Sequence, residues 1–206
     1  MGAAPSLGYG PALTEMTLSS PCIELDHLEA GYDRAVVGPL SFALDAGEIV
    51  ALWGPNGSGK TTAMNAIGGG ARVFAGEVRK RPGLRVSHQH QNPLSLRDIP
   101  LSGRELLALT SSDAAALPAS LQPLLARRLS ELSGSQLQLL QVWACLTAPV
   151  DVVMLDEPTN NVDAAGVALL QQVIAQARDG RGVLLVSHDR RFVEALNARI
   201  VEVERR

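Results

Sequence analysis

Residues 54–62 read Gly-Pro-Asn-Gly-Ser-Gly-Lys-Thr-Thr and lie between an apolar run at 49–53 and a predicted helix at 60–67. They match the pattern GxxxxGK, followed by Ser or Thr, at every fixed position. Glycines let successive backbone N–H groups converge on phosphate oxygens, and the helix presents its positive dipole end to the same anion. An ordinary glycine-rich turn is the alternative, but it does not require the whole pattern. We therefore predict a nucleotide-binding loop formed by Gly54, Pro55, Asn56, Gly57, Ser58, Gly59, Lys60, Thr61 and Thr62.

Two adjacent carboxylates, Asp156 and Glu157, follow a second apolar run at 152–155. Ligands of open α/β sheets bind at the carboxyl ends of strands, where these residues are expected. We predict that Asp156 and the Thr61 hydroxyl hold Mg²⁺ and that Lys60 neutralises the β- and γ-phosphates of ATP. Glu157 would face the γ-phosphate and polarise the attacking water as general base. An acidic turn after a strand is common by itself, so this interpretation depends on the phosphate loop.

Composition limits the classes of protein to which the chain can belong. Its 206 residues fit one domain with a small inserted lobe, and 46% hydrophobic residues suffice for a full core. A net charge of −3 and 3% aromatic residues argue against a nucleic-acid surface, so no direct nucleic-acid partner is expected. The longest apolar runs are about five residues, far below the roughly 18 to 20 that cross a bilayer, so we expect a soluble chain.

The ends and the cysteines add little to this picture. Residues 1–20 lack the pattern of a secretory signal and are expected to form a disordered tail. Cys22 and Cys145 have no CxxC context, which favours reduced thiols in the cytoplasm.

His88 and His90 alternate at a probable strand end and suggest a metal site, but neither His27 nor another residue supplies a third ligand at convincing spacing. We leave the three histidines unassigned.

The order of predicted elements gives the fold class. The first half contains strands and a small hairpin around Arg81-Pro82-Gly83, with strand segments at 22–28, 39–43, 49–53, 76–79 and 84–88. Leu- and Ala-rich segments broken by prolines predict a helical lobe at about 92–131. Helices and strands then alternate, with helices at 134–146, 164–178 and 190–196 and strands at 152–155 and 183–186. We predict an α/β P-loop NTPase core over 21–206, with a mainly parallel sheet flanked by helices, a small antiparallel β lobe and a short inserted helical lobe.

Several further segments occur in the order typical of one family. Leu132-Ser133-Gly134-Ser135-Gln136 resembles the LSGGQ signature of ATP-binding-cassette ATPases, 156–159 resembles their Walker B motif, and 186–189 resembles their switch-histidine segment. The resemblance covers about 23–204. It implies that His188 and Gln91 act with Glu157 in catalysis, that Gln91 also binds the metal, and that Tyr32 stacks on adenine. It further implies nucleotide contacts from the signature and D-loop residues Ser133, Gly134, Ser135, Gln136 and Asp163.

The same resemblance implies a second copy of the chain as a partner. In this family the signature segment caps the nucleotide of the other protomer, so two ATP molecules with Mg²⁺ lie between two head-to-tail copies. Two departures are visible: Ser135 replaces the second signature glycine, which could strain the backbone, and Leu139 replaces a common arginine. Because Lys60, Gln91, Glu157 and His188 are present, hydrolysis is still expected.

Two branches of the family compete for the physiological role. The segments 84–86 and 99–102, together with the span of 91 − 60 = 31 residues from Lys60 to Gln91, resemble zinc and manganese uptake ATPases. That branch implies membrane permease subunits, a substrate-binding protein, and a cytoplasmic location at the inner face of the membrane. The segments 156–160 and 187–192 also resemble ribosome-associated members, which normally join two cassettes in a longer chain. We favour the transporter because only one cassette is present, and an inactive scaffold would require loss of Lys60 or Glu157.

Overall fold

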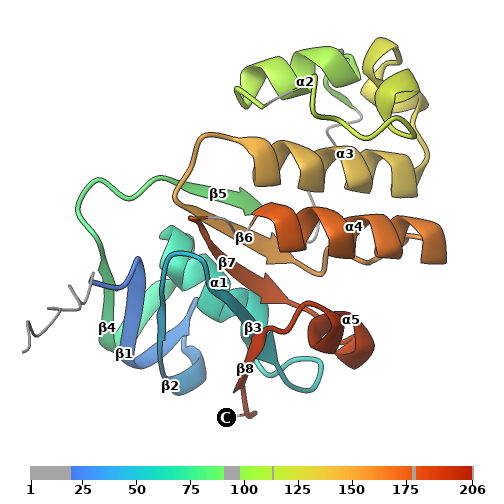
Figure 1. The fold of residues 1–206 in the computed structure, drawn as a ribbon. Helices are drawn as coiled ribbons and strands as arrows, with labels where there is room; N and C mark the ends of the chain where they lie inside the picture. The colour runs from blue at the N-terminus through green and yellow to red at the C-terminus, as the bar shows by residue number, and fades with distance from the viewer. Residues whose placement is uncertain (1–19, 91–97, 113, 178–179, 206) are drawn as a thin grey trace, which may run out of the picture.

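The computed structural model describes residues 20–90, 98–112, 114–177 and 180–205. Within them a five-stranded parallel sheet has the order β5-β6-β7-β3-β8, and a three-stranded antiparallel sheet has the order β2-β1-β4 (Figure 1). This confirms the predicted α/β class with its parallel and antiparallel parts. The tail predicted at 1–20 falls, apart from Ser20, outside the described residues.

The three central strands of the parallel sheet are buried on both faces. They are β3 (Ile49–Trp53), β6 (Val152–Asp156) and β7 (Gly182–Val186). Ile49 and Ala51 of β3 belong to the core shared with the helices α3 and α4, whereas Val50 and Leu52 belong to the core shared with α1 and the antiparallel sheet. Such strands read as continuous apolar runs, which is why the sequence located them. Figure 1 shows the resulting layers.

The antiparallel sheet and α1 cover one face of this sheet. β1 (Ile23–Gly31) pairs with β2 (Ala35–Leu44) on one side and with β4 (Arg72–Lys80) on the other. Helix α1 (Lys60–Gly68) contacts both β1 and β2 and fills the space between the two sheets.

The predicted hairpin at 76–79 and 84–88 is wrong. Arg79 of β4 lies opposite Glu24 of β1, whereas β5 (Val86–Gln89) runs parallel to β6 with Val86 opposite Val152. The turn around Pro82 carries the chain from one sheet to the other, and Asp151, which precedes β6, accepts a hydrogen bond from the Arg85 N–H at 2.9 Å. Turn residues specify a local change of direction, but they do not specify which sheet the next strand joins.

The helical lobe is short. Its described part contains α2 (Gly103–Leu109) and the 3₁₀ helices η2 (Gln122–Ala126) and η3 (Leu129–Glu131). It packs through Leu107 and Leu125 on the core that also contains α3 (Gly134–Thr147). The first predicted residues of the lobe, 92–97, lie outside the described residues.

The carboxyl-terminal part alternates as predicted. α4 (Ala164–Ala177), β7 and α5 (Arg190–Ala195) begin and end within one or two residues of the predicted bounds. β8 (Arg199–Glu202) was not predicted; it pairs parallel with β3 at the edge of the sheet. This strand is mostly exposed and has a charged residue at each end, so the sequence contains no long apolar run that would predict it.

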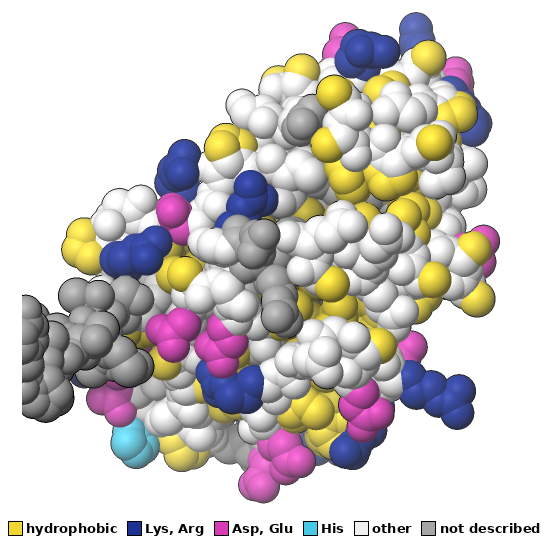
Figure 2. Space-filling view, in the orientation of Figure 1, with side chains coloured by type: hydrophobic (Ala, Val, Ile, Leu, Met, Phe, Trp, Pro, Cys, Tyr) yellow, Lys and Arg dark blue, Asp and Glu magenta, His cyan; other side chains and the backbone are white. Residues whose placement is uncertain are grey.

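Among the described residues, no helix is both long and apolar enough to span a bilayer. On the face shown in Figure 2, Lys and Arg side chains are interspersed with Asp and Glu side chains.

Replacing Leu140 with Ala tests whether α3 holds the helical layer on the sheet. Leu140 is fully buried in that core, so removing its side chain should lower the free energy of unfolding by about 2 to 5 kcal/mol. Leu109 in α2 is 71% exposed, and Leu109→Ala should change the free energy by less than about 0.5 kcal/mol. Urea denaturation followed by circular dichroism measures both, and equal effects would contradict this packing.

Candidate active site

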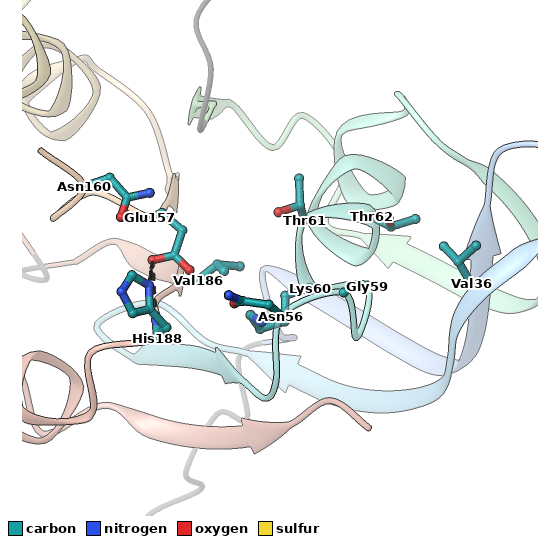
Figure 3. A pocket seen from close by; sticks show the side chains of 11 residues that line it. Val36, Asn56, Gly59, Lys60, Thr61, Thr62, Glu157, Asn160, Val186 and His188 are labelled. Carbon is teal, nitrogen blue, oxygen red and sulfur yellow. Dashed lines mark hydrogen bonds and ion pairs between the residues drawn. The ribbon is translucent and has the colours of Figure 1, made fainter. Parts of the chain in front are cut away.

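The loop between β3 and α1 forms one wall of a cavity of about 460 Å³. Gly57 and Gly59 have the left-handed φ values of 78° and 93°. A Cβ on Gly59 would lie 2.6 Å from the Val37 Cβ, so this glycine is required by space as well as by conformation. Figure 3 shows the side chains that line the cavity: Val36, Asn56, Lys60, Thr61, Thr62, Glu157, Asn160, Val186 and His188, together with the backbone at Gly57 and Gly59.

Lys60 is buried and folded against the loop from which it starts. Its Nζ donates hydrogen bonds to the carbonyl oxygens of Gly54 at 2.8 Å and Pro55 at 2.9 Å. Burial lowers the pKa of Lys60, while the charges of Glu157 and Asp156 act to raise it. The hydroxyl of Ser58 is also buried, and it has no hydrogen-bond partner among the described residues. Ser58 does not line the cavity, whereas Lys60 does, and a buried cation on the wall of a cavity suits a phosphate group.

Asp156 is hydrogen-bonded to Thr61, which lines the cavity. Thr61 Oγ1 donates a hydrogen bond to Asp156 Oδ1 at 3.2 Å, and Asp156 is 1% exposed at the end of β6. Burial raises the pKa of Asp156 to about 6, although the hydrogen bond from Thr61 acts in the opposite direction. A carboxylate and a hydroxyl are hard oxygen donors, which fit Mg²⁺. The residues present therefore suit the predicted metal.

Glu157 and His188 form a hydrogen-bonded pair on the opposite wall. The His188 Nδ1 lies 2.8 Å from Glu157 Oε2, as the dashed line in Figure 3 marks. Glu157 is buried and has a left-handed φ of 50°, and its N–H donates to the Val186 carbonyl at 2.9 Å. A non-glycine residue in this region costs free energy and persists where its surroundings hold it, as is common at functional sites. The pair is a carboxylate oriented by an imidazole, an arrangement suited to accepting a proton from water.

The signature residues lie in a different place. Ser133, Ser135, Gln136 and Asp163 line a separate hollow of about 340 Å³ between α3 and α4. Ser133 Oγ accepts from the Gln136 N–H and Gln136 Oε1 accepts from the Ser133 N–H, both at 3.1 Å, which caps α3. Asp163 Oδ1 accepts from the Gly166 N–H at 2.8 Å at the start of α4. A single chain therefore does not bring these residues to the phosphate loop.

Three predictions from the resemblance have separate outcomes. Ser135 lies in the first turn of α3 with a helical backbone, so the backbone strain considered for this residue is absent. Tyr32 is 54% exposed after β1, where its hydroxyl accepts a hydrogen bond from Asn65 Nδ2 at 3.0 Å, and it does not line the cavity. Gln91 lies outside the described residues.

Sequence reasoning missed three residues that line the cavity, namely Val36, Asn160 and Val186, the last of which ends β7 just before the predicted switch histidine. Asn160 follows the carboxylates by three positions and could have been included with their turn. Val36 comes from β2 of the antiparallel sheet. It carries no chemical signal, because its place beside Gly59 depends on the packing of the two sheets.

Replacing Gly59 with Ala tests the shape of the loop. The added Cβ would meet Val37, so ATP binding should weaken by at least about tenfold, or about 1.4 kcal/mol. Gly69→Ala is the matched control, since Gly69 has a similar φ of 83° at the other end of α1 but open space around its Cβ position. Titration with a fluorescent ATP analogue measures both variants. The assignment fails if the two lose the same affinity or if neither does.

Comparisons with known proteins agree with this geometry. The ABC transporter family model matches residues 37–160, which is more than half of the chain. The zinc import ATP-binding protein ZnuC of Jannaschia sp. (strain CCS1) is 34% identical over 188 residues, covering 87% of this chain and 77% of that protein.

Solved structures show the same fold. An ATP-binding subunit of an ABC transporter superposes with a TM-score of 0.74 at 21% identity, covering 89% of this chain and 86% of that one. The archaeal ribosome recycling factor aABCE1, in its complex with the ribosomal stalk protein aP1, superposes with a TM-score of 0.73 at 21% identity over 96% of this chain and 39% of that chain. Together with the sequence relatives, the phosphate loop and the paired carboxylates, these findings show that the chain belongs to the ABC transporter family, as an ATP-hydrolysing subunit.

Proposed function

We propose that two copies of this chain bind and hydrolyse ATP between them and thereby drive zinc import through a membrane permease. The observation that carries the dimer is the separation of the two hollows. Lys60, Glu157 and His188 line one, whereas the exposed start of α3 at Ser133 and Gly134 lies at the other. The first turn of a helix carries unpaired N–H groups and positive charge, which favours a nearby anion. A second copy can bring that turn to the nucleotide bound by the first.

The hydrolytic step is assigned to the residues of the first hollow. Lys60 and the N–H groups of the loop bind the phosphates. Glu157, oriented by His188, takes a proton from the water whose oxygen attacks the γ-phosphorus, and the bond to the β-phosphate oxygen breaks to release ADP. Thr61 and Asp156 would hold Mg²⁺, with Gln91 as a proposed further ligand. When bound, the ion supplies charge neutralisation on the β- and γ-phosphates.

The second copy completes the site in this proposal. Ser133, Gly134, Ser135 and Gln136 direct the start of their helix at the γ-phosphate, and Asp163 lies beside them on the same hollow. Tyr32, exposed and fixed by Asn65, stacks on the adenine. ATP then lies between the surfaces of the two copies, and its hydrolysis removes the γ-phosphate that both copies contact.

The transported ion and the membrane partners are inferred from the relatives. The relative from Jannaschia and a second from Marinobacter nauticus, 32% identical over 192 residues, are both named zinc import ATP-binding proteins. We infer zinc as the cargo, a permease and a substrate-binding protein as partners, and a position at the inner face of the membrane. The ribosome-associated role is not favoured, because the likeness to the recycling factor extends to the fold alone.

Replacing Glu157 with Gln tests the base and the dimer together. The amide cannot accept the proton, so ATP hydrolysis should slow by about 10² to 10⁴-fold while ATP stays bound. Size-exclusion chromatography with ATP should then show a stable dimer. Lys60→Ala should stay monomeric in the same experiment, because the phosphates lose their cation. Hydrolysis of ATP by Glu157→Gln at the wild-type rate would refute the role of the carboxylate.

Zinc import is tested in cells of the source organism. Deleting the gene should lower cell zinc, measured by mass spectrometry, when external zinc is scarce. The wild-type gene should restore the zinc content, and Lys60→Ala should not. Two results together would contradict the transport role and favour the ribosomal one: unchanged zinc in the deletion strain, and sedimentation of the protein with ribosomes in wild-type cells.

A further inference from the structure

A second large cavity lies at the other end of α1, away from the phosphate loop. It has a volume of about 550 Å³, and of its lining residues the proposed ATPase mechanism uses Asn65, which fixes Tyr32. Its walls come from the carboxyl-terminal end of α1, the turn between β4 and β5, and the strands β5 and β6. The residues relevant to its chemistry are His88, His90, Met154, Lys80 and the glycines 68–70.

Two histidines occupy one side of this cavity. His88 in β5 and His90 just after it are two positions apart, so both side chains leave the strand on the same side. Their ring centroids are 3.7 Å apart and the ring planes are inclined by 38°. His90 is exposed, whereas His88 is half-buried.

His88 has a nitrogen without a partner. Its Nε2 is buried and makes no hydrogen bond to any described residue. A buried polar nitrogen left unpaired costs free energy, and such an atom in a native fold calls for an explanation. An imidazole nitrogen with no hydrogen-bond partner has a lone pair that a metal ion can use.

The surroundings of His88 favour a cation of soft character. α1 ends at Gly68, and a Cβ on Gly68 would lie 3.7 Å from His88 Nδ1, so the ring abuts the negative end of the helix dipole. Met154 lies opposite His88 in the pairing of β5 with β6, and its thioether lines the same cavity. Lys80 also lines the cavity, but its side chain belongs to an exposed position of β4.

We propose that His88 and His90 bind one divalent transition-metal ion, of the kind represented by Zn²⁺, with water in the remaining coordination positions. Among the described residues no group of three or more His, Cys, Asp or Glu side chains is placed to bind a metal. The proposal therefore rests on two imidazoles as the protein's ligands. Imidazole ligands suit Zn²⁺, Ni²⁺ and Cu²⁺, whereas Mg²⁺ and Ca²⁺ prefer oxygen. The site is therefore distinct from the Mg²⁺ position at Asp156. It depends neither on ATP hydrolysis nor on the identity of the transported ion.

The test measures zinc binding to the full chain with any purification tag removed and without nucleotide. Isothermal titration calorimetry should give one Zn²⁺ per wild-type chain, and Co²⁺ should give visible absorption bands of a nitrogen-ligated ion. The double variant His88→Gln, His90→Gln should bind Zn²⁺ at least about tenfold more weakly. His90→Gln alone, at the exposed position, should weaken binding too and guards against misfolding of the double variant. Mg²⁺ at equal concentration should not displace the Zn²⁺.

Two matched variants separate this site from other places where zinc could bind. His27→Gln removes an exposed histidine that pairs with Asp26 on the other sheet, and it should leave zinc binding unchanged. His188→Gln removes the histidine of the proposed active site and should also leave zinc binding unchanged. Wild-type affinity in the double variant and in His90→Gln, or loss of binding in His188→Gln instead, would overturn the proposal, and so would a wild-type chain that binds no Zn²⁺.

Discussion

The parallel pairing of β6, β7 and β3 is the constraint on which the rest of the molecule depends. Ile49 lies opposite Val183, and Asp156 lies opposite Val186, so the three strands end at the same edge. The phosphate loop follows β3, the carboxylates follow β6, and His188 follows β7. Backbone hydrogen bonds between apolar strands thus determine where three chemically unrelated segments meet. Nothing in the polar residues themselves would bring them together.

That edge also holds backbone conformations that an isolated chain would avoid. Glu157 and Gly59, on facing walls of the cavity, both have positive φ values. The Glu157 N–H is hydrogen-bonded to the Val186 carbonyl, and its carboxylate to His188, so β7 fixes the residue from two directions. Gly59 is confined by Val37 of the antiparallel sheet. The smaller sheet therefore contributes to the site by limiting the shape of the loop, although it brings no ionisable group to the cavity.

The accuracy of the sequence predictions follows from how local each signal is. The strands β3, β6 and β7 were predicted because strands buried on both faces need consecutive apolar residues, and the phosphate loop was predicted because its chemistry is contained in nine consecutive residues. The hairpin was wrong because the partner of β5 lies more than sixty positions away in β6. Val36 was missed because its place in the cavity also depends on a contact between segments that are distant in the sequence, β2 and the phosphate loop. The surroundings of His88 are likewise tertiary: its Nδ1 lies beside Gly68 at the end of α1, a proximity that no spacing in the sequence reveals.

The departures from the family pattern can be explained by the contact between α3 and α4. Leu139 is buried in the core between the sheet and the helical layer, and its Cδ1 would lie 3.4 Å from a Cβ on Gly166 near the start of α4. An apolar side chain suits this position because Asp163 is already engaged in capping α4. On its other side α3 reaches the carboxylate turn, where Gln138 Nε2 donates to the Pro158 carbonyl at 3.3 Å. α3 is thus joined both to α4 and to the turn after Glu157. In the proposed dimer, the helix whose first turn meets the partner's nucleotide is therefore the same helix that is hydrogen-bonded to the turn beside the proposed general base of its own chain.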